Sequence, residues 1–171
     1  MTEHLGYYRS PTIHGDRVAF VCESDLWSVS TAGGSARRLT ATTIDIHSPF
    51  FSTDGKHLAF RGYQEGSHEI YVMPASGGRP IRLTLMGAPC VVTGWSSDNQ
   101  RVLFGSMAGQ PFRRGYQQWS VAATGGAPVQ NPIGPADRIS HGPRGGVVIG
   151  RNVGDPARWK RYRGGTTGDL W

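Results

Sequence analysis

Long hydrophobic runs are missing from this sequence of 171 residues. No stretch reaches the roughly 18 apolar residues of a membrane-spanning helix. The opening ten residues, Met1 to Ser10, contain no hydrophobic core of a secretion signal. These absences predict a cytoplasmic chain that makes no contact with a membrane.

Residues that commonly bind metals or form disulfides are few or scattered. The only cysteines are Cys22 and Cys90, too few for a disulfide framework, and their apolar neighbours favour buried thiols over metal ligands. The six histidines show no ligand spacing, and neither His-Glu-x-x-His nor Cys-x-x-Cys occurs. The glycine pairs lack the frame of a phosphate-binding loop. We therefore expect no metal and no cofactor.

Acidic residues are outnumbered, but mainly in one region. The chain has 18 Lys and Arg against 12 Asp and Glu, a formal charge of +6. Between Arg144 and Arg163 stand six basic residues and a single acid, Asp155. This patch lacks the interleaved aromatics of a single-strand binding platform. A solvated loop or a peptide-facing rim explains it better than a nucleic-acid partner.

Glycine, in contrast, is abundant. There are 25 glycines and 11 prolines, and the glycine share is about twice the usual ~7%. No Gly-X-Y period accompanies them, which excludes collagen, and a helical bundle is disfavoured. Turns must therefore be frequent.

The chain repeats one pattern of short apolar runs and turns. Its most complete copy occupies residues 48–60, 69–73 and 77–84, and similar copies precede and follow it. Matched hydrophobic positions, Val18, Leu58, Val102 and Val147, lie 40, 44 and 45 residues apart. A period of about 40–50 residues with several short strands is typical of β-propeller blades.

Each copy predicts a four-stranded antiparallel meander. In the second, Asp54-Gly55 is a turn dipeptide between two strands, and Gly77-Gly78 leads into an outermost strand at 80–83. An aromatic recurs in the third strand and suits packing between sheets: Trp27, Tyr71, Trp119 and Trp171. We predict an all-β, partial propeller of three blades and most of a fourth, at about 6–40, 44–84, 90–130 and 136–171.

The pattern Ser-x-Asp-Gly-Lys, Ile-Tyr-Val, Gly-Gly, Arg-Leu-Thr resembles the TolB-type, WD40-like propeller repeat. Other stretches resemble the opening part of the tricorn protease family, and the resemblance spans essentially the whole chain. These stretches are Ile13-His14-Gly15-Asp16-Arg17-Val18-Ala19-Phe20-Val21 with Asp25-Leu26-Trp27, then Gln110-Pro111-Phe112, and Gly150-Arg151-Asn152 through Gly168-Asp169-Leu170-Trp171.

The resemblance implies a large cytoplasmic serine peptidase that trims peptides. Such proteins combine a six-bladed propeller, a seven-bladed propeller, a PDZ domain and a catalytic core, and assemble as homohexamers. The resemblance implies that this chain is a non-catalytic part of the first propeller, framing a peptide or product channel and docking other domains of the parent and partner aminopeptidases. The alternative is a TolB-like interaction propeller with no linked peptidase.

No catalytic site is expected within the chain itself. Ser10, His14 and Asp16 are close in sequence, but a meander arm explains them, and Ser10 lacks a nucleophile elbow. In proteins that resemble tricorn, an arginine pair just ahead of the third blade's inner strand can anchor the C-terminus of a peptide. Residues 85–90 read Leu-Met-Gly-Ala-Pro-Cys, with no arginine.

Two basic segments are the candidate peptide-binding residues. Each follows the second strand of its unit, and a propeller gathers such connections at one mouth of its channel. Guanidinium groups there could pair with peptide carboxylates through two hydrogen bonds. Alternatively, the segments form a solvated rim or pair with other domains. The candidates are Arg113 and Arg114 in the third unit, and Arg158, Lys160, Arg161 and Arg163 in the fourth.

Overall fold

The structure is a computed structural model that describes residues 6–111, 115–142, 146–151 and 169–170. These residues form strands and turns and contain no helix, so none of them builds a membrane-spanning helix. The strands are β1 (Arg9–His14), β2 (Arg17–Cys22), β3 (Asp25–Ser30), β4 (Arg37–Arg38), β5 (Asp45–Phe51), β6 (His57–Tyr63), β7 (His68–Pro74), β8 (Ile81–Arg82), β9 (Cys90–Trp95), β10 (Arg101–Ser106), β11 (Gln117–Ala122), β12 (Val129–Pro135), β13 (Arg138–His141), β14 (Val147–Arg151) and β15 (Asp169–Leu170).

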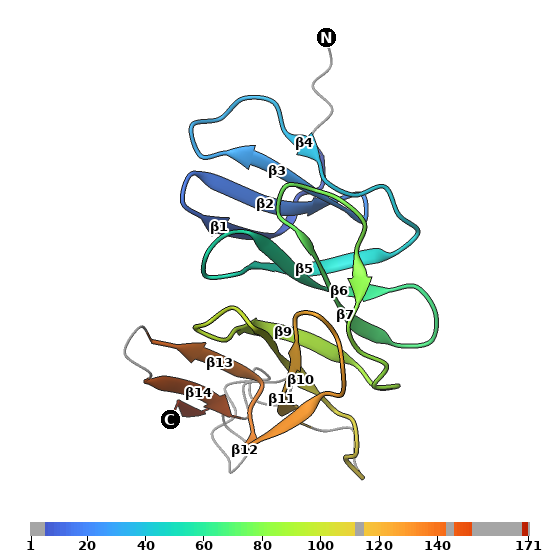
Figure 1. Ribbon diagram of the computed structural model, residues 1–171, viewed down its shortest axis with the longest axis vertical. Coiled ribbons are helices and arrows are strands. Elements are labelled where there is room, and N and C mark those ends of the chain that lie inside the picture. The colour runs from blue at the N-terminus through green and yellow to red at the C-terminus, as the bar shows by residue number, and fades with distance from the viewer. Residues whose placement is uncertain (1–5, 112–114, 143–145, 152–168, 171) are drawn as a thin grey trace, which may run out of the picture.

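The strands form four separate sheets in chain order. Sheet 1 is β1-β2-β3-β4, sheet 2 is β5-β6-β7-β8, sheet 3 is β9-β10-β11-β12, and the described part of sheet 4 is β13-β14-β15. Every neighbouring pair is antiparallel, and Figure 1 shows the sheets following one another. The prediction of an all-β propeller built from four-stranded antiparallel meanders is confirmed.

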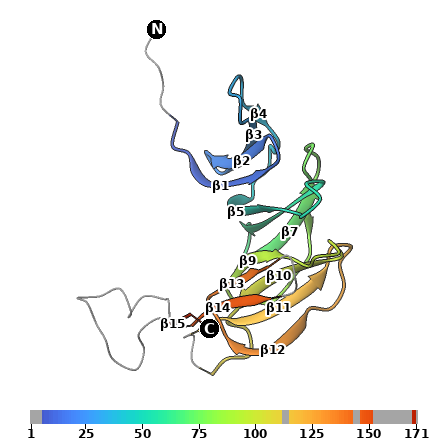
Figure 2. The same cartoon turned by 90° about the vertical axis from the view of Figure 1, so that its left-hand side faces the viewer.

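The first strand of each sheet lies on the inside of the arrangement. β1 contacts β5, β5 contacts β9, and β9 contacts β13. Figure 2 shows these strands along the inner side of the curve, with β4 and β12 on the outer side. This order is that of propeller blades, whose first strands line a central channel.

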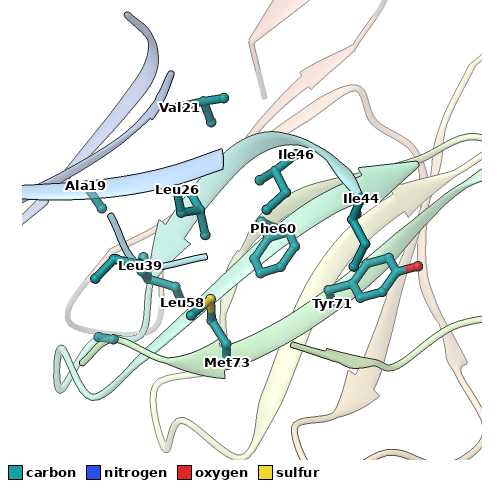
Figure 3. Close-up of a cluster of buried hydrophobic side chains, with 11 residues drawn as sticks. Ala19, Val21, Leu26, Leu39, Ile44, Ile46, Leu58, Phe60, Tyr71 and Met73 are labelled. Carbon is teal, nitrogen blue, oxygen red and sulfur yellow. The ribbon is translucent and has the colours of Figure 1, made fainter. Parts of the chain in front are cut away.

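Two hydrophobic clusters join the first three sheets. Between sheets 1 and 2, Leu26 packs with Ile46 and Phe60, all fully buried (Figure 3), and the rings of Phe60 and Tyr71 stack at 5.7 Å. Between sheets 2 and 3, the cluster includes Val72 and Phe104. Neighbouring sheets therefore share a dry interface, which explains the apolar second strands of the repeat.

The predicted two-residue turn at Asp54-Gly55 proves longer. β5 ends at Phe51 and β6 begins at His57. The Asp54 carboxylate accepts hydrogen bonds from the Ser52 hydroxyl at 2.6 Å and the Lys56 amide at 3.1 Å. These side-chain bonds replace ladder bonds. Gly55 has a φ of 68°, as glycine permits.

A buried hydrogen-bond pair fixes the outermost strand in sheet 2. The Thr84 hydroxyl donates to Glu69 Oε2 at 2.5 Å and accepts from the Ile70 amide at 2.9 Å. The other Glu69 oxygen accepts from the Gly87 amide at 3.1 Å. Thr40 makes the same two bonds in sheet 1, to Asp25 and Leu26. The threonine of the Arg-Leu-Thr motif therefore anchors the outer strand to the third strand.

Sheet 1 has a second face that no other sheet covers among the described residues. Side chains of this face line an open groove of about 400 Å³: Tyr8, Arg9, Pro11, Val18, Phe20, Val29 and Ala36. By strand register, Val18 and Phe20 correspond to Leu58 and Phe60 of sheet 2, which are both fully buried against sheet 1. The groove therefore has the residue types of a sheet-to-sheet interface.

Candidate functional site

Bulges shape the inner strands near their beginnings. In β1 the register shifts after Arg9, and in β5 it shifts after His47. Ser10 and Ser48, the next residues, have φ values of 49° and 46°. A bulge re-aims the side chains around it. Arg9 and His47 therefore occupy equivalent positions at the same end of neighbouring inner strands.

Ionisable side chains gather at this end of the sheets. We call Arg9 (β1), Asp45 and His47 (β5), Arg61 (β6) and His68 (β7) the inner-end cluster. His47 Nε2 lies 3.0 Å from Asp45 Oδ2, and the rings of His47 and His68 are 5.9 Å apart. The His47 side chain is 20% exposed and that of Asp45 is 44% exposed, so the cluster is open to solvent through Asp45.

The Asp45 carboxylate is held in its charged form. Burial raises the pKa of Asp45, but hydrogen bonds from Ser24 and His47, together with the positive charges of His47 and Arg9, outweigh burial and lower that pKa overall. Ser24 belongs to the turn between β2 and β3. Asp45 Oδ2 is therefore engaged by His47 of its own strand, whereas Asp45 Oδ1 is buried and has no hydrogen-bond partner among the described residues.

Burial disfavours the charged forms of Arg61 and His68. Burial lowers the pKa of Arg61, although the nearby Tyr116 and Asp45 partly offset it. Burial also lowers the pKa of His68, and the charges of Arg61 and His47 lower it further, against a raising effect of Asp45. His68 is therefore neutral at pH 7, while Arg61 remains charged in a place that disfavours positive charge.

The side-chain Nε of neither arginine in the cluster has a hydrogen-bond partner in the part of the chain that the structure describes. Both Nε–H groups are buried and donate no hydrogen bond there. Arg9 does lie over the ring of Tyr7, at 5.7 Å from its centroid. No carboxylate comes within ion-pair distance of Arg61 among the described residues. A buried N–H group of a charged side chain that makes no hydrogen bond lowers the stability of the folded protein, unless another group accepts that hydrogen bond.

The six predicted peptide-binding residues lie outside the described residues: Arg113, Arg114, Arg158, Lys160, Arg161 and Arg163. The ends of the connections that contain them are described. Ser106 pairs with Gln117, and Arg151 pairs with Asp169. Both connections therefore open from the end where the inner strands begin, the end that holds the inner-end cluster.

Sequence reasoning missed the inner-end cluster. Its histidines looked scattered, because His47 and His68 are 21 positions apart in the sequence. The repeat pattern was the sequence signal that could have revealed this cluster. Once each inner strand is aligned on its bulge, Arg9 and His47 fall at one position, and antiparallel pairing brings Arg61 opposite His47.

The described residues offer no metal-binding set. No group of three or more His, Cys, Asp or Glu among them could hold a metal ion. His14 Nε2 lies 3.0 Å from the Thr53 carbonyl oxygen, across the gap between sheets 1 and 2. Burial raises the pKa of the Cys90 thiol to about 12, which makes it unreactive. What this end of the sheets can do chemically is bind a charged group.

The family model and two relatives that match this chain are all named as tricorn proteases or as parts of them. A family model described as the tricorn protease N-terminal beta propeller domain matches residues 5–171. The tricorn protease homolog 1 of Streptomyces coelicolor is 38% identical over 167 residues, which is 96% of this chain but 16% of that protein. A protein of Sulfurisphaera tokodaii, provisionally named a tricorn-like protease N-terminal subunit, is 29% identical, with 96% of this chain and 85% of that protein covered.

Solved structures give the same picture. The crystal structure of the tricorn protease matches 97% of this chain with a TM-score of 0.83 and 31% identity, and the match covers 17% of that chain. A TolB structure from Agrobacterium tumefaciens matches with a TM-score of 0.71 at 20% identity. The TolB match supports the propeller fold alone. The chain thus spans about one sixth of the Streptomyces relative and of the tricorn protease structure.

Proposed function

Because this chain belongs to the tricorn protease family, whose N-terminal propeller model it matches over residues 5–171, we propose that it is a non-catalytic propeller segment of a serine peptidase. In this role it frames a channel for peptides or products and offers surfaces to other domains and to partner peptidases. The peptidase chemistry belongs to parts of the protein outside these residues. Cytoplasmic location and a homohexameric assembly belong to the same proposal.

One observation carries the channel role: the inner strands β1, β5, β9 and β13 converge, and ionisable groups gather where they begin. The connections that hold the six predicted basic residues open from this same end. Peptides carry a terminal carboxylate, and arginine binds carboxylates through paired, charge-assisted hydrogen bonds. A basic channel mouth is therefore suited to peptides.

The four sheets also support a proposal for the domain. We assign the blades to about 6–40, 44–84, 90–130 and 136–171, as parts of a six-bladed ring. The open groove on sheet 1 supports a ring, because its apolar lining corresponds to side chains that sheet 2 buries against its neighbour. The TolB-like alternative without a peptidase has no observation in its favour beyond the shared fold.

The test compares long and short substrates in the intact protein. Arg113→Glu with Arg114→Glu should lower kcat/KM for peptides of about ten residues by about tenfold, since charge reversal at the mouth repels their carboxylates. A short chromogenic substrate should be cleaved at the wild-type rate. The control is Arg37→Glu with Arg79→Glu, which makes the same charge change at two exposed positions, one on and one just before an outer strand.

Two results would contradict the proposal. If the intact protein cleaves no peptide, the link to a peptidase fails. If it cleaves long peptides equally well with and without the Arg113 and Arg114 substitutions, or if the control slows them as much, the mouth has no role in peptide passage.

A further inference from the structure

A layer of ionisable side chains lies at the inner end of the interface between sheets 2 and 3. β6 alternates between the two faces of sheet 2: Phe60 packs towards sheet 1 and Ala59 packs towards sheet 3. Arg61 therefore shares the second face with Ala59, and His47 is its partner in the strand register. The ring of His68 lies 5.9 Å from that of His47. These groups thus lie beside the apolar cluster that joins the two sheets.

The two ends of this interface are held differently. At the end that carries the turns between first and second strands, which we call the turn end, Asn99 Oδ1 accepts hydrogen bonds from the amide and the hydroxyl of Thr53, each at 2.7 Å. The Trp95 indole also donates to the Phe50 carbonyl at 3.2 Å. Among the described residues, no hydrogen bond runs from the inner-end cluster to sheet 3, and Arg61 Nε is buried without a partner. The inner end is therefore the weaker end of the joint.

A positive charge on His68 would strain this weaker end. The only acid of the cluster, Asp45, already pairs with His47 at 3.0 Å. A proton on His68 would place a second cation near Arg61, in partly buried surroundings where like charges repel more strongly than in open water. The titratable and charged groups packed around His68 and Arg61 are Asp45 and His47 on β5, Tyr63 on β6, and Tyr116 of sheet 3, ahead of β11.

We propose that the joint between sheets 2 and 3 opens at its inner end when His68 gains a proton, while the turn end stays closed. The inference concerns the sheets themselves and does not depend on the proposed peptidase role. In the closed joint, burial and the charges of Arg61 and His47 lower the pKa of His68 from its ordinary value of 6.5. Opening would hydrate the imidazole and restore that value. The open form therefore binds more protons, and its population should grow as the pH falls below about 6.5.

Cys90 is a natural reporter of this opening. It is fully buried in the cluster between sheets 2 and 3, and it begins β9 at the inner end. Dithiodipyridine labels thiols even at about pH 5.5, because its leaving group departs readily. The labelling rate in urea at the same pH gives the intrinsic reactivity of the site, so the ratio of the two rates is a protection factor free of the reagent's own pH dependence. Digestion and mass spectrometry assign the label to Cys90 in the intact protein.

The protection factor of Cys90 should fall about fivefold in the wild type between about pH 6.5 and 5.5, within the limit of about tenfold that one proton allows. His68→Gln keeps a polar side chain but cannot titrate, so its protection should change less than about twofold. His68→Lys is already charged at about pH 7.5 and should expose Cys90 there. His141→Gln is the matched control: it removes an exposed histidine of β13 and should behave as the wild type.

A second reporter shows which end opens. Val121 is fully buried in the same cluster and lies near the turn end, because it pairs with Val102, which in turn pairs with Trp95. In Val121→Cys, protection at the introduced thiol should not change with pH. Constant protection there also excludes global unfolding as the cause of labelling at Cys90.

Three results would overturn the inference. One is an equal loss of Cys90 protection in the wild type and in His68→Gln. Another is a loss of protection at position 121 in step with that at Cys90, because the opening would then not be confined to the inner end. The third is unchanged protection of Cys90 in folded His68→Lys at neutral pH. None of these measurements uses a peptide, so the proposed channel stands or fails separately.

Discussion

Replacing Thr84 by valine should loosen the outer part of sheet 2 without disturbing its packing. The two side chains have nearly the same shape, so the change removes a hydroxyl and little else. That hydroxyl donates to Glu69 Oε2 at 2.5 Å and accepts from the Ile70 amide at 2.9 Å. Thr84 is 2% exposed and Glu69 is 1% exposed, so water cannot replace either bond.

The magnitude follows from the two lost partners. A buried amide left without an acceptor costs about 1–3 kcal/mol, and a hydrogen bond to a charged group contributes about 1.5–3 kcal/mol. In the variant, the Glu69 carboxylate still accepts hydrogen bonds from the amides of Met86 and Gly87, at 3.0 and 3.1 Å, and still lies 3.6 Å from Arg82 Nη2. Its charge therefore keeps partners. We expect a loss of about 3 kcal/mol in local stability.

Amide hydrogen exchange in the intact protein measures this locally. The amides that open with the outer strand include that of Leu83, which donates to the Ile70 carbonyl at 2.8 Å. A loss of about 3 kcal/mol should speed their exchange about 100-fold. Thr53→Val is the control: it removes an exposed hydroxyl that donates to Asn99 at 2.7 Å, and exchange should change less than about fivefold.

An acceleration of less than about fivefold in Thr84→Val would refute the reasoning, because it would mean that Glu69 and the Ile70 amide find other partners at little cost. The equivalent change in sheet 1, Thr40→Val, provides a repeat of the test. It breaks bonds to Asp25 at 2.6 Å and to the Leu26 amide at 2.9 Å. Its effect should be of similar size and confined to β3 and β4.

Two further predictions concern pH and a turn. The pKa of His68 in the folded protein lies below its ordinary value of 6.5, so the unfolded state binds more protons between these two pKa values, and the stability of the protein should fall as the pH drops below about 6.5. The variant His68→Gln should flatten this fall in thermal unfolding, and parallel curves for the variant and the wild type would contradict the prediction. Gly55→Ala should destabilise the protein by about 2 kcal/mol or more, because both the φ of 68° and the nearby ring of His14 oppose a Cβ. The control Gly15→Ala, at a φ of 57° with open space around it, should cost about 1 kcal/mol. Equal shifts of the unfolding temperature in the two variants would argue against the close approach of His14 to Gly55.

The repeat pattern predicted the sheets because each strand carries its own local signal. Apolar runs such as Leu58-Ala59-Phe60 and glycine turns recur at blade spacing, and they lie where strands and turns were expected. The predicted length of the Asp54-Gly55 turn was wrong, because hydrogen bonds from Ser52 and Lys56 to the Asp54 carboxylate hold a longer turn. The motif Arg-Leu-Thr could be seen in the sequence, but its structural role could not, because that role depends on a hydrogen bond between Thr84 and Glu69, which are 15 positions apart.

The inner-end cluster was harder to predict, for a geometric reason. Its residues come from four strands, and what joins them is the pairing register and the approach of β1 to β5. A one-residue change of register would move Arg61 to the other face of sheet 2. The bulges after Arg9 and His47 set that register near the inner end. Charge counts cannot reveal such a site, because the cluster holds only two of the eighteen basic residues.

The sequence of a single repeat unit does not determine which of its side chains are buried. Val18 and Phe20 line an open groove on sheet 1, whereas their counterparts Leu58 and Phe60 are fully buried. Similar side chains in the same register thus have different surroundings, because only one of the two sheets has a described neighbour on that face. The half-buried Phe20 ring would lose its remaining contact with water only against a neighbouring surface on that face of sheet 1. The residue type at this position therefore follows from the ring of sheets and not from the meander that contains it.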